Sequence, residues 1–287
     1  MSVLDDIIAG VREDLEARKL KVSLAQLQDL IAARDPALDA WAALGGDSPR
    51  AGVKVIAEVK RRSPSKGALA EIADPARLAG KYADGGAAVI SVLTEERRFG
   101  GSLADLDAVR AAVGIPVLRK DFTCDPYQIW EARAHGADLI LLIVAALGDA
   151  ELAEYLALAH ELGMNALVET HTSEEVQRAV AAGARIIGVN VRNLKTLDVD
   201  RSVFGSLAGL IPAEALVVAE SGVRDADDVR AYAGHGANAV LVGEALVSHA
   251  TPGERIAEFG SAGAAAISAA AISAEATATA DSGRALS

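Results

Sequence analysis

The stretch VKVIAEVKRRSPSKG, residues 53–67, sets a pattern that the rest of the chain repeats. Its first half is apolar and rich in β-branched residues, which is typical of a strand buried on both faces. Side chains alternate along a strand, so Ile56, Glu58 and Lys60 are predicted to share one face. The stretch therefore predicts a buried strand whose carboxyl end presents charged side chains and leads into a polar, cationic loop.

The charged pair at the end of this strand has two interpretations. Removing an isolated carboxylate or ammonium from water costs on the order of several kcal/mol per ion, unless the ion is paired or used. Glu58 and Lys60 form an ordinary salt bridge if the strand surfaces into solvent there. The cationic loop at residues 61–63, stiffened by Pro64, favours the other interpretation, a site for an anionic ligand.

Composition excludes several classes of protein. The chain has 287 residues, 51% of them apolar, and a formal net charge of −12. This charge argues against a broad basic surface for nucleic acid, so any bound phosphate needs a local site. We expect no membrane span, because no apolar run approaches ~20 residues, and no signal peptide, because Asp5 and Asp6 follow the start. The single cysteine, Cys124, excludes an internal disulfide and indicates a reducing compartment, so the expected location is the cytoplasm.

From residue 53 a unit of apolar strand, polar turn and amphipathic helix recurs. Strands are predicted at 53–59, 87–92, 116–119, 138–143, 165–168, 185–190, 215–219 and 238–242. Helices are predicted between them near 74–84, 102–113, 125–135, 149–162, 172–182, 200–209 and 225–234. Eight such strands close into a (β/α)8 barrel or lie in an open doubly wound sheet. Polar residues end nearly all of them, which favours the α/β barrel.

The barrel is expected to occupy residues 51–259, with a last helix near 252–259. Residues 1–50 are expected to form a helical extension packed on it, with helices at 2–20 and 23–33 and an irregular connection at 34–50. Residues 260–287 are rich in Ala, Ser and Thr, with few large apolar side chains. Such a segment buries too little surface to offset its ordering entropy, so a disordered tail is predicted.

Two strand ends carry candidates for acid–base chemistry. Lys120 ends the run PVLRK, where apolar walls and other cations would lower its pKa toward that of a useful acid; the alternative is a lysine whose ammonium reaches solvent. Glu169 ends ALVET and is either a base or an acid that caps the next helix. His171, although close to Glu169, is assigned to the start of that helix.

The last two strand ends resemble phosphate-binding turns. Glu220, Ser221 and Gly222 follow the seventh strand, and Gly243 and Glu244 follow the eighth. Glycine lets a backbone approach an anion closely, and the loops after these two strands commonly hold phosphate in a barrel. Each glycine alone is equally explained by a turn. No residues have metal-ligand spacing, and no dinucleotide or nucleotide-triphosphate motif occurs, so neither metal nor cofactor is expected.

Seven motifs together resemble the indole-3-glycerol phosphate synthase family of tryptophan biosynthesis. They are AEVKRRSPSKG, LRKDFTCDPYQI, GADLILLI, LVET, GVNVRNLKTLDVD, AESGV and VLVGEAL, in the order of that family. The resemblance runs from the N-terminal helices to about residue 258. It implies a carboxy-lyase with a (β/α)8 barrel, whose extra N-terminal helices help to cover the substrate. The implied reaction converts 1-(2-carboxyphenylamino)-1-deoxyribulose 5-phosphate into indole-3-glycerol phosphate, carbon dioxide and water, without a cofactor.

The resemblance also implies roles for single residues. Lys120 is similar to the acid that protonates the sugar carbonyl, Glu169 to the base of the final dehydration, and Glu58 with Lys60 to a pair that assists. Implied substrate-orienting residues are Asn190, Arg192 and Ser221; phosphate-contacting positions are Ser63, Gly222 and Gly243, with Glu220 and Glu244 beside them; apolar walls are Phe122, Leu141 and Leu194. Glu244 departs from members with serine there, so its backbone N–H and not its carboxylate is expected to face the phosphate.

Two rival functions remain at the level of sequence. One is another phosphosugar barrel enzyme, such as a phosphoribosylanthranilate isomerase, since a fold alone does not set the chemistry. The other is a silent barrel that binds a phosphorylated metabolite. The presence of both Lys120 and Glu169 counts against each of them. In every case the expected partner is a small phosphorylated molecule, not nucleic acid or a membrane, and association with other enzymes of the pathway is left open.

Overall fold

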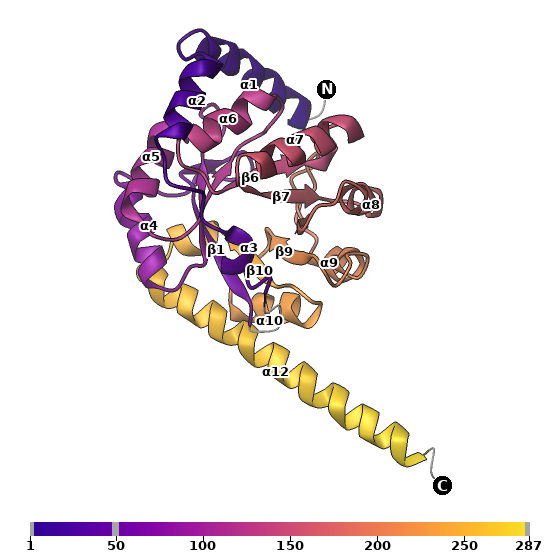
Figure 1. Cartoon of the computed structure of the whole chain (residues 1–287). Helices are drawn as coiled ribbons and strands as arrows, with labels where there is room; N and C mark the ends of the chain where they lie inside the picture. Colours follow the sequence, from indigo (N-terminus) through magenta and orange to yellow (C-terminus); the bar gives the residue numbers. More distant parts are fainter. Residues whose placement is uncertain (1–2, 48–51, 285–287) are drawn as a thin grey trace.

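The computed structural model describes residues 3–47 and 52–284, with side chains up to residue 268. Eight parallel strands form a closed barrel in the order β1, β10, β9, β8, β7, β6, β5, β4 (Figure 1). They are β1 (Lys54–Val59), β4 (Val89–Leu93), β5 (Val117–Lys120), β6 (Leu139–Ile143), β7 (Asn165–Thr170), β8 (Ile186–Asn190), β9 (Leu216–Glu220) and β10 (Ala239–Val242). The first and last strands pair from Lys54 with Ala239 to Ala57 with Val242, and this pairing closes the barrel. The predicted (β/α)8 barrel is confirmed.

A helix follows each of the first seven barrel strands, as predicted. These helices are α4 (Pro75–Asp84), α5 (Leu103–Ala112), α6 (Pro126–Ala134), α7 (Asp149–Glu161), α8 (Ser173–Ala181), α9 (Phe204–Ala208) and α10 (Ala226–Gly234). Side-chain N-caps start several of them, from Asp74, Ser102, Asp125, Thr172 and Asp225, because such oxygens satisfy the free N–H groups of a first turn. Helix α9 is shorter than predicted and is preceded by the 3-10 turn η2 (Arg201–Val203); η1 (Val144–Ala146) follows β6.

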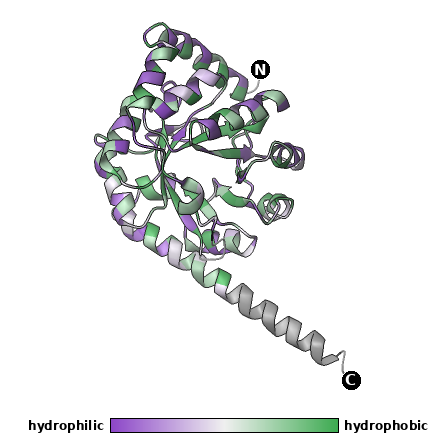
Figure 2. Ribbon diagram, in the orientation of Figure 1, coloured by the Kyte–Doolittle hydropathy of each residue, from purple (hydrophilic) through white to green (hydrophobic). Residues whose placement is uncertain are grey.

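The core has two parts, because each barrel strand buries both of its faces. Outward-facing residues such as Val55 and Ala57 pack against the ring of helices. Inward-facing residues such as Ile56, Leu118 and Leu167 fill the barrel. The strands are accordingly green in the hydropathy view, and purple residues lie mainly on the helices and loops (Figure 2). Ile56 faces inward with Glu58 and Lys60 beyond it, as the alternation in β1 predicts.

The connection ahead of β1 closes the amino-terminal end of the barrel. It was predicted to be mostly irregular, and it contains the short helix α3 (Ala40–Ala43). Ala40 and Leu44 are buried against the interior residues of the barrel. The Asn165 side chain accepts hydrogen bonds from the backbone N–H of Ala40 at 2.9 Å and of Trp41 at 3.2 Å. This end is therefore plugged, and the open mouth lies at the carboxyl ends of the strands.

Helices α1 (Val3–Lys19) and α2 (Leu24–Ala32) pack beside α6 (Figure 1). Leu15 and Leu27 are buried against Tyr127 and Ala134 of α6. The other end of α1 buries Ile7 and Val11 against Cys124, near the mouth. Cys124 thus acts as a small packing residue. Residues 48–51 lie outside the described part of the chain.

The C-terminal tail differs from the expectation. Helix α12 (Pro252–Arg284) continues through residues 260–284, which were predicted to be disordered; residues 285–287 lie outside the described residues. Alanine has the highest helix propensity, so this composition favours a helix where a packed helix already precedes it. Ile256 and Phe259 are buried, Ala262 is also buried, and Ile267 packs against the outer core. The packed part of α12 therefore extends at least eight residues beyond the predicted boundary at 259.

Truncations on either side of Ile267 test this packing. Removal of residues 261–287 deletes the contacts of Ala262 and Ile267, and we expect the melting temperature to fall by about 3–8 °C. Removal of residues 269–287 retains those contacts and should leave the melting temperature within about 1 °C of the full chain. Turnover should be nearly unchanged in both, since α12 does not line the mouth. Equal melting temperatures for the two truncations would contradict a packed segment after residue 260.

The remaining short elements are α11 (Glu244–Val247) and a two-stranded antiparallel hairpin of β2 (Arg62–Ser63) and β3 (Gly67–Ala68). The hairpin lies within the predicted cationic loop after β1, so that loop has a defined shape. Within the described residues, no helix is long and apolar enough to cross a bilayer.

Candidate active site

A cavity of about 590 Å³ opens at the carboxyl ends of the barrel strands. The structure brings every expected site residue to it, although they come from all parts of the chain. These residues are Glu58, Lys60, Ser63, Lys120, Phe122, Leu141, Glu169, Asn190, Arg192, Leu194, Glu220, Ser221, Gly222, Gly243 and Glu244. Since the carboxyl ends of parallel strands meet at one face of a barrel, residues far apart in sequence converge there.

Glu58 and Lys60 form a close ion pair on the inner face of β1. Lys60 Nζ lies 2.5 Å from Glu58 Oε2, and the Glu58 side chain is 3% exposed. A side-chain carbon at position 243 would come within 2.5 Å of the same oxygen, so Gly243 leaves room for this carboxylate. Burial raises the pKa of Glu58, but the nearby ammonium groups of Lys60 and Lys120 outweigh burial and lower it. Glu58 is therefore a buried carboxylate held ionised beside the half-buried Lys60, and the pair is not a salt bridge in open solvent.

Lys120 lies between two buried carboxyl groups at the centre of the cavity. Its Nζ is 3.6 Å from Glu169 Oε2 and 3.7 Å from Glu220 Oε2. The expectation that its surroundings lower its pKa is wrong. Burial does disfavour the ammonium, but Glu169, Glu220 and Glu58 together outweigh burial and raise the pKa of Lys120. The sequence placed Glu58, Glu169 and Glu220 at the same mouth as Lys120, but it did not give their distances, so the prediction gave too much weight to burial and to the neighbouring cations.

The two carboxyl groups beside Lys120 have opposite pKa shifts. For Glu220, burial and the negative charge of Glu169 raise the pKa well above its usual value. For Glu169, burial acts in the same direction, but Lys120 and His171 outweigh it and lower the pKa. The two environments therefore favour a proton on Glu220 over a proton on Glu169. Two buried acids with separated pKa values provide one proton donor and one base at the same place.

His171 contacts Glu169 directly, and the sequence did not show this contact. Its Nε2 lies 3.3 Å from Glu169 Oε1, and its Nδ1 lies 3.1 Å from Glu175 Oε2. His171 does lie at the start of α8, as predicted: it precedes the N-cap Thr172, which accepts a hydrogen bond from the Glu175 N–H, and its own N–H donates to the Glu175 side chain. The same geometry excludes the alternative in which Glu169 caps this helix.

The turn after β9 has an unusual backbone. Ser221 and Gly222 both have positive φ, 67° and 78°, and a side-chain carbon at 222 would lie 2.7 Å from Tyr232 Oη. Ser221 Oγ donates a hydrogen bond of 2.9 Å to Asn190 Oδ1, which ties the ends of β8 and β9 together. Arg201 Nε donates to the Gly222 carbonyl at 2.7 Å. The Arg201 side chain therefore holds the backbone of this turn through its hydrogen bond to Gly222.

Glu244, whose orientation the sequence did not determine, forms an ion pair with Lys66 of the loop after β1. The pair joins the loops after the neighbouring strands β1 and β10 and holds the carboxylate against a cation. Ser63, on β2 of the same loop, also lines the cavity.

One wall of the cavity is apolar. Phe122, Leu141 and Leu194 pack against the interior core, as the sequence suggested. Phe99 adds a second ring, with its centroid 6.0 Å from that of Phe122. Val3, Leu4 and Ile7 of α1 complete the lining. The cavity therefore combines an apolar wall with polar and cationic side chains, which suits an aromatic molecule that carries an anionic group.

A family model for indole-3-glycerol phosphate synthase matches residues 4–259. The chain belongs to this family. A protein of that name from Arthrobacter sp. strain FB24 is 76% identical over 270 residues, which cover 94% of this chain and 99% of that protein. Another, from Paenarthrobacter aurescens strain TC1, is 75% identical over 268 residues, 93% of this chain and 98% of that protein.

Among solved structures, a 3-hexulose-6-phosphate synthase is similar with a TM-score of 0.60 and 20% identity, over 73% of this chain and 99% of that one. At this identity the likeness concerns the barrel fold alone.

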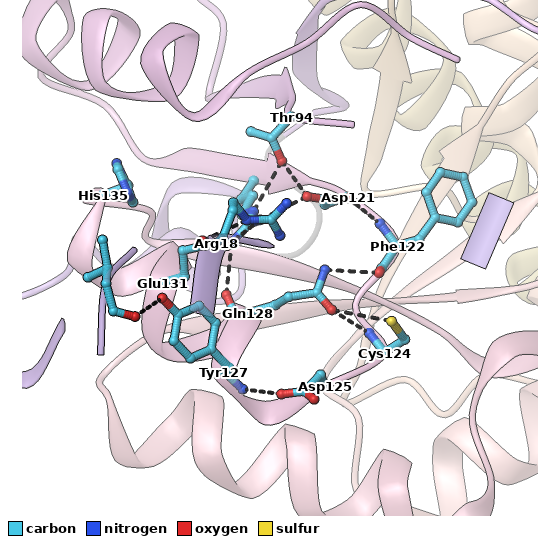
Figure 3. A network of polar contacts seen from close by, with 12 residues as sticks. Arg18, Thr94, Asp121, Phe122, Cys124, Asp125, Tyr127, Gln128, Glu131 and His135 are labelled. Atoms are coloured by element: carbon cyan, nitrogen blue, oxygen red, sulfur yellow. Dashed lines mark hydrogen bonds and ion pairs between the residues drawn. The ribbon is translucent and has the colours of Figure 1, made fainter. Parts of the chain in front are cut away.

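In this indole-3-glycerol phosphate synthase family member, a buried polar network fixes the turn after β5 (Figure 3). Asp121 accepts hydrogen bonds from Thr94 Oγ1 at 2.6 Å and from the Phe122 N–H at 2.8 Å. The Gln128 side chain donates to the Phe122 carbonyl at 3.1 Å and accepts from the Cys124 N–H at 2.9 Å. Because both backbone groups of Phe122 and the Cys124 N–H are hydrogen-bonded to these side chains, Phe122 keeps its place in the wall beside Lys120.

Behind this turn, Arg119 connects the barrel to the N-terminal helix. Its NH2 group lies 2.9 Å from both Asp121 Oδ2 and Glu131 Oε2, and Arg18 of α1 donates to Glu131 Oε1 at 2.8 Å. Arg119 is 3% exposed, and such a buried cation is tolerated because both of its carboxylate partners are present.

Several cavity residues of this family member were missed by the sequence analysis. They are Val3, Leu4, Ile7, Phe99 and Arg201. The apolar side of α1 was visible as helical periodicity, but its contact with the mouth depends on packing against α6. No local pattern marks Arg201, which precedes α9 and reaches the cavity through the turn after β9. Among the residues described, no cluster of His, Cys, Asp and Glu is arranged to hold a metal ion.

Proposed function

We propose that the chain converts 1-(2-carboxyphenylamino)-1-deoxyribulose 5-phosphate into indole-3-glycerol phosphate, carbon dioxide and water. The observation that carries the proposal is the position of Lys120, within 3.7 Å of two buried carboxyl groups and next to an apolar wall. Ring closure requires a proton donor at the sugar carbonyl, and dehydration requires a base nearby. The aromatic ring would occupy the compartment lined by Phe122, Leu141 and Leu194, which excludes water from the reacting atoms.

The reaction is proposed to begin at Lys120. The ring carbon that bears the carboxylate attacks the sugar carbonyl carbon, and the carbonyl oxygen takes a proton from the Lys120 ammonium. The raised pKa of Lys120 keeps it protonated, and the alkoxide that forms is basic enough to accept the proton. Carbon dioxide then leaves, and the electron pair of its bond restores the aromatic ring. In the final step Glu169 removes a proton from the new five-membered ring, and the new hydroxyl takes a proton from the Lys60 ammonium and departs as water.

The charged pair on β1 and the turns after β8 and β9 are proposed to hold the substrate. Glu58 orients Lys60, whose ammonium offers a charge to the anionic substrate. Asn190, Arg192 and Ser221 would orient the sugar chain. The phosphate is proposed to contact Ser63 and the backbone of Gly222 and Gly243, with Glu220 and Glu244 beside it in the lining. The ion pair with Lys66 offsets the negative charge of Glu244 there.

A direct assay tests the function. Purified protein and the carboxyphenylamino substrate should give indole fluorescence and one carbon dioxide for each indole. Phosphoribosylanthranilate should not be isomerised. Turnover of phosphoribosylanthranilate, or binding of the carboxyphenylamino substrate without product, would favour the isomerase or the silent barrel instead.

The phosphate contact predicts inhibition by inorganic phosphate in competition with the substrate. Gly222→Asp should raise KM by at least about tenfold, because the new side chain meets Tyr232 and adds a negative charge at a positive-φ position. Gly114→Asp is the matched control: nothing lies within 4 Å of its side-chain position, and KM should not change. Normal substrate binding by Gly222→Asp would place the phosphate elsewhere.

We further propose that the protein works in the cytoplasm on this small phosphorylated substrate, without cofactor, metal, membrane or nucleic acid. The net charge of −12 and the single buried cysteine support this assignment. We also propose the division into residues 1–50, 51–259 and a C-terminal tail, with the correction that the start of that tail packs on the barrel.

A further inference from the structure

Glu169 and Glu220 share Lys120 almost equally, so Lys120 alone cannot determine which of them acts as the base. Their nearest oxygens lie 3.6 and 3.7 Å from Lys120 Nζ, and both residues are at least 98% buried. Two buried carboxyl groups this close do not both ionise easily, and one proton is expected between them at neutral pH. Another group must break the symmetry.

His171 contacts one member of this pair and not the other. Its Nε2 lies 3.3 Å from Glu169 Oε1, on the side away from the oxygen that faces Lys120. Within the described residues, no cation other than Lys120 lies within ion-pair distance of Glu220. His171 does not line the cavity, so it acts behind Glu169 and does not touch a bound substrate.

Glu175 holds the imidazole in this orientation. Its Oε2 lies 3.1 Å from His171 Nδ1 and accepts a hydrogen bond of 2.8 Å from the His171 N–H. Glu175 is fixed in turn by its own N–H, which donates to the N-cap Thr172. The ring therefore lies between two carboxylates, one at each nitrogen, and this arrangement favours the imidazolium.

We propose that His171 is a positioning residue that makes Glu169 the base, by placing a second cation against that carboxylate alone and so leaving the shared proton on Glu220. This inference rests on the proposed function, in which Glu169 removes a proton during dehydration. A base that is already protonated cannot act, so the location of this one proton sets the fraction of competent enzyme.

The charges that surround Glu169 agree with this role. They are Lys120 on β5, Glu58 and Lys60 on β1, Glu220 on β9, and His171 and Glu175 at the start of α8. Burial lowers the pKa of His171, but its contacts with Glu169 and Glu175 outweigh burial and raise it to about 10. The imidazolium is therefore present throughout the neutral range.

His171→Gln tests the inference, because its side-chain amide reaches the position of Nε2 and donates a hydrogen bond without a charge. Loss of the cation raises the pKa of Glu169. As the pH is lowered, Glu169 then becomes protonated, and activity is lost, at a higher pH than in the wild type. We expect the acid limb of the kcat profile to move up by at least about one pH unit. On the acid side of the limb, kcat should then be about tenfold lower than that of the wild type at the same pH. KM should stay within about twofold, and activity should recover at high pH. Glu175→Gln should shift the limb in the same direction by a smaller amount.

Two controls separate this role from a structural one. His135→Gln removes a second carboxylate-paired histidine, 2.9 Å from Asp107 and outside the cavity, and its profile should match the wild type. NMR titration of the His171 ring in wild-type protein should show it protonated up to about pH 10.

The inference is overturned by a His171→Gln variant whose acid limb does not move, and which has a lower melting temperature and an equally lowered kcat at every pH. A neutral His171 ring at pH 7 also overturns it. Failure of the wild type to convert the substrate refutes the proposed function instead, and the ring titration does not depend on it.

Discussion

Lys120→Met should lower kcat by about 10²–10⁴-fold while the protein still folds. Methionine retains the length and the apolar contacts of the lysine stem, but it has no proton to deliver to the sugar carbonyl. Because proton delivery matters most in the transition state, the loss should appear in kcat, and KM should change much less. Single-turnover kinetics that follow carbon dioxide release measure the step directly.

The three carboxylates around Lys120 require a control for charge. Lys120→Arg retains a cation near Glu58, Glu169 and Glu220, but a guanidinium does not give up its proton. We therefore expect it to remain about as slow as Lys120→Met. A wild-type rate in Lys120→Arg would mean that the positive charge alone suffices. Carbon dioxide release at the wild-type rate in Lys120→Met would mean that another group is the acid.

Glu169→Gln should stop the reaction later, after carbon dioxide has left. Glutamine is nearly the same size as glutamate but cannot accept a proton, so dehydration should slow by about 10²–10⁴-fold. A ring-closed, decarboxylated species should then accumulate within a single turnover. Carbon dioxide and indole, followed separately, should appear together in the wild type and be separated in time in the variant.

Glu220→Gln provides the comparison for this step. Burial and Glu169 raise the pKa of Glu220, and glutamine retains a hydrogen-bond donor at that place, so carbon dioxide and indole should remain coupled in this variant. Accumulation of the intermediate in Glu220→Gln and not in Glu169→Gln would exchange the roles of the two residues.

Local sequence alone determined the barrel. Each strand buries both faces and reads as a short apolar run, and most of the helices between the strands start at a capping side chain, so neither depends on distant parts of the chain. The strand ends could be identified for the same reason. Closure of a parallel barrel sends all of these ends to one face, and this placed Glu58, Lys120 and Glu169 together before any contact was known.

The sequence was less informative where an element depends on its partners. Residues 34–50 appear irregular because α3 has only four residues, and its role depends on the interior it plugs. The alanine-rich segment after residue 260 has few large apolar residues. One of them, Ile267, still packs against the outer core, because α12 lies along α4, α10 and β1. Helix α1 showed its apolar face in the sequence, while its contact with the cavity required α6.

The tertiary structure alone decided the protonation of the site. From the sequence, Lys120 had apolar and cationic neighbours, which predicted a lowered pKa; the fold brings Glu58, Glu169 and Glu220 to it from three other strands and raises that pKa. His171 is two residues from Glu169 in the sequence, yet its function depends on Glu175 and on the direction of its ring. Electrostatic energies fall with distance in space and rise with burial, and neither quantity is encoded in local sequence.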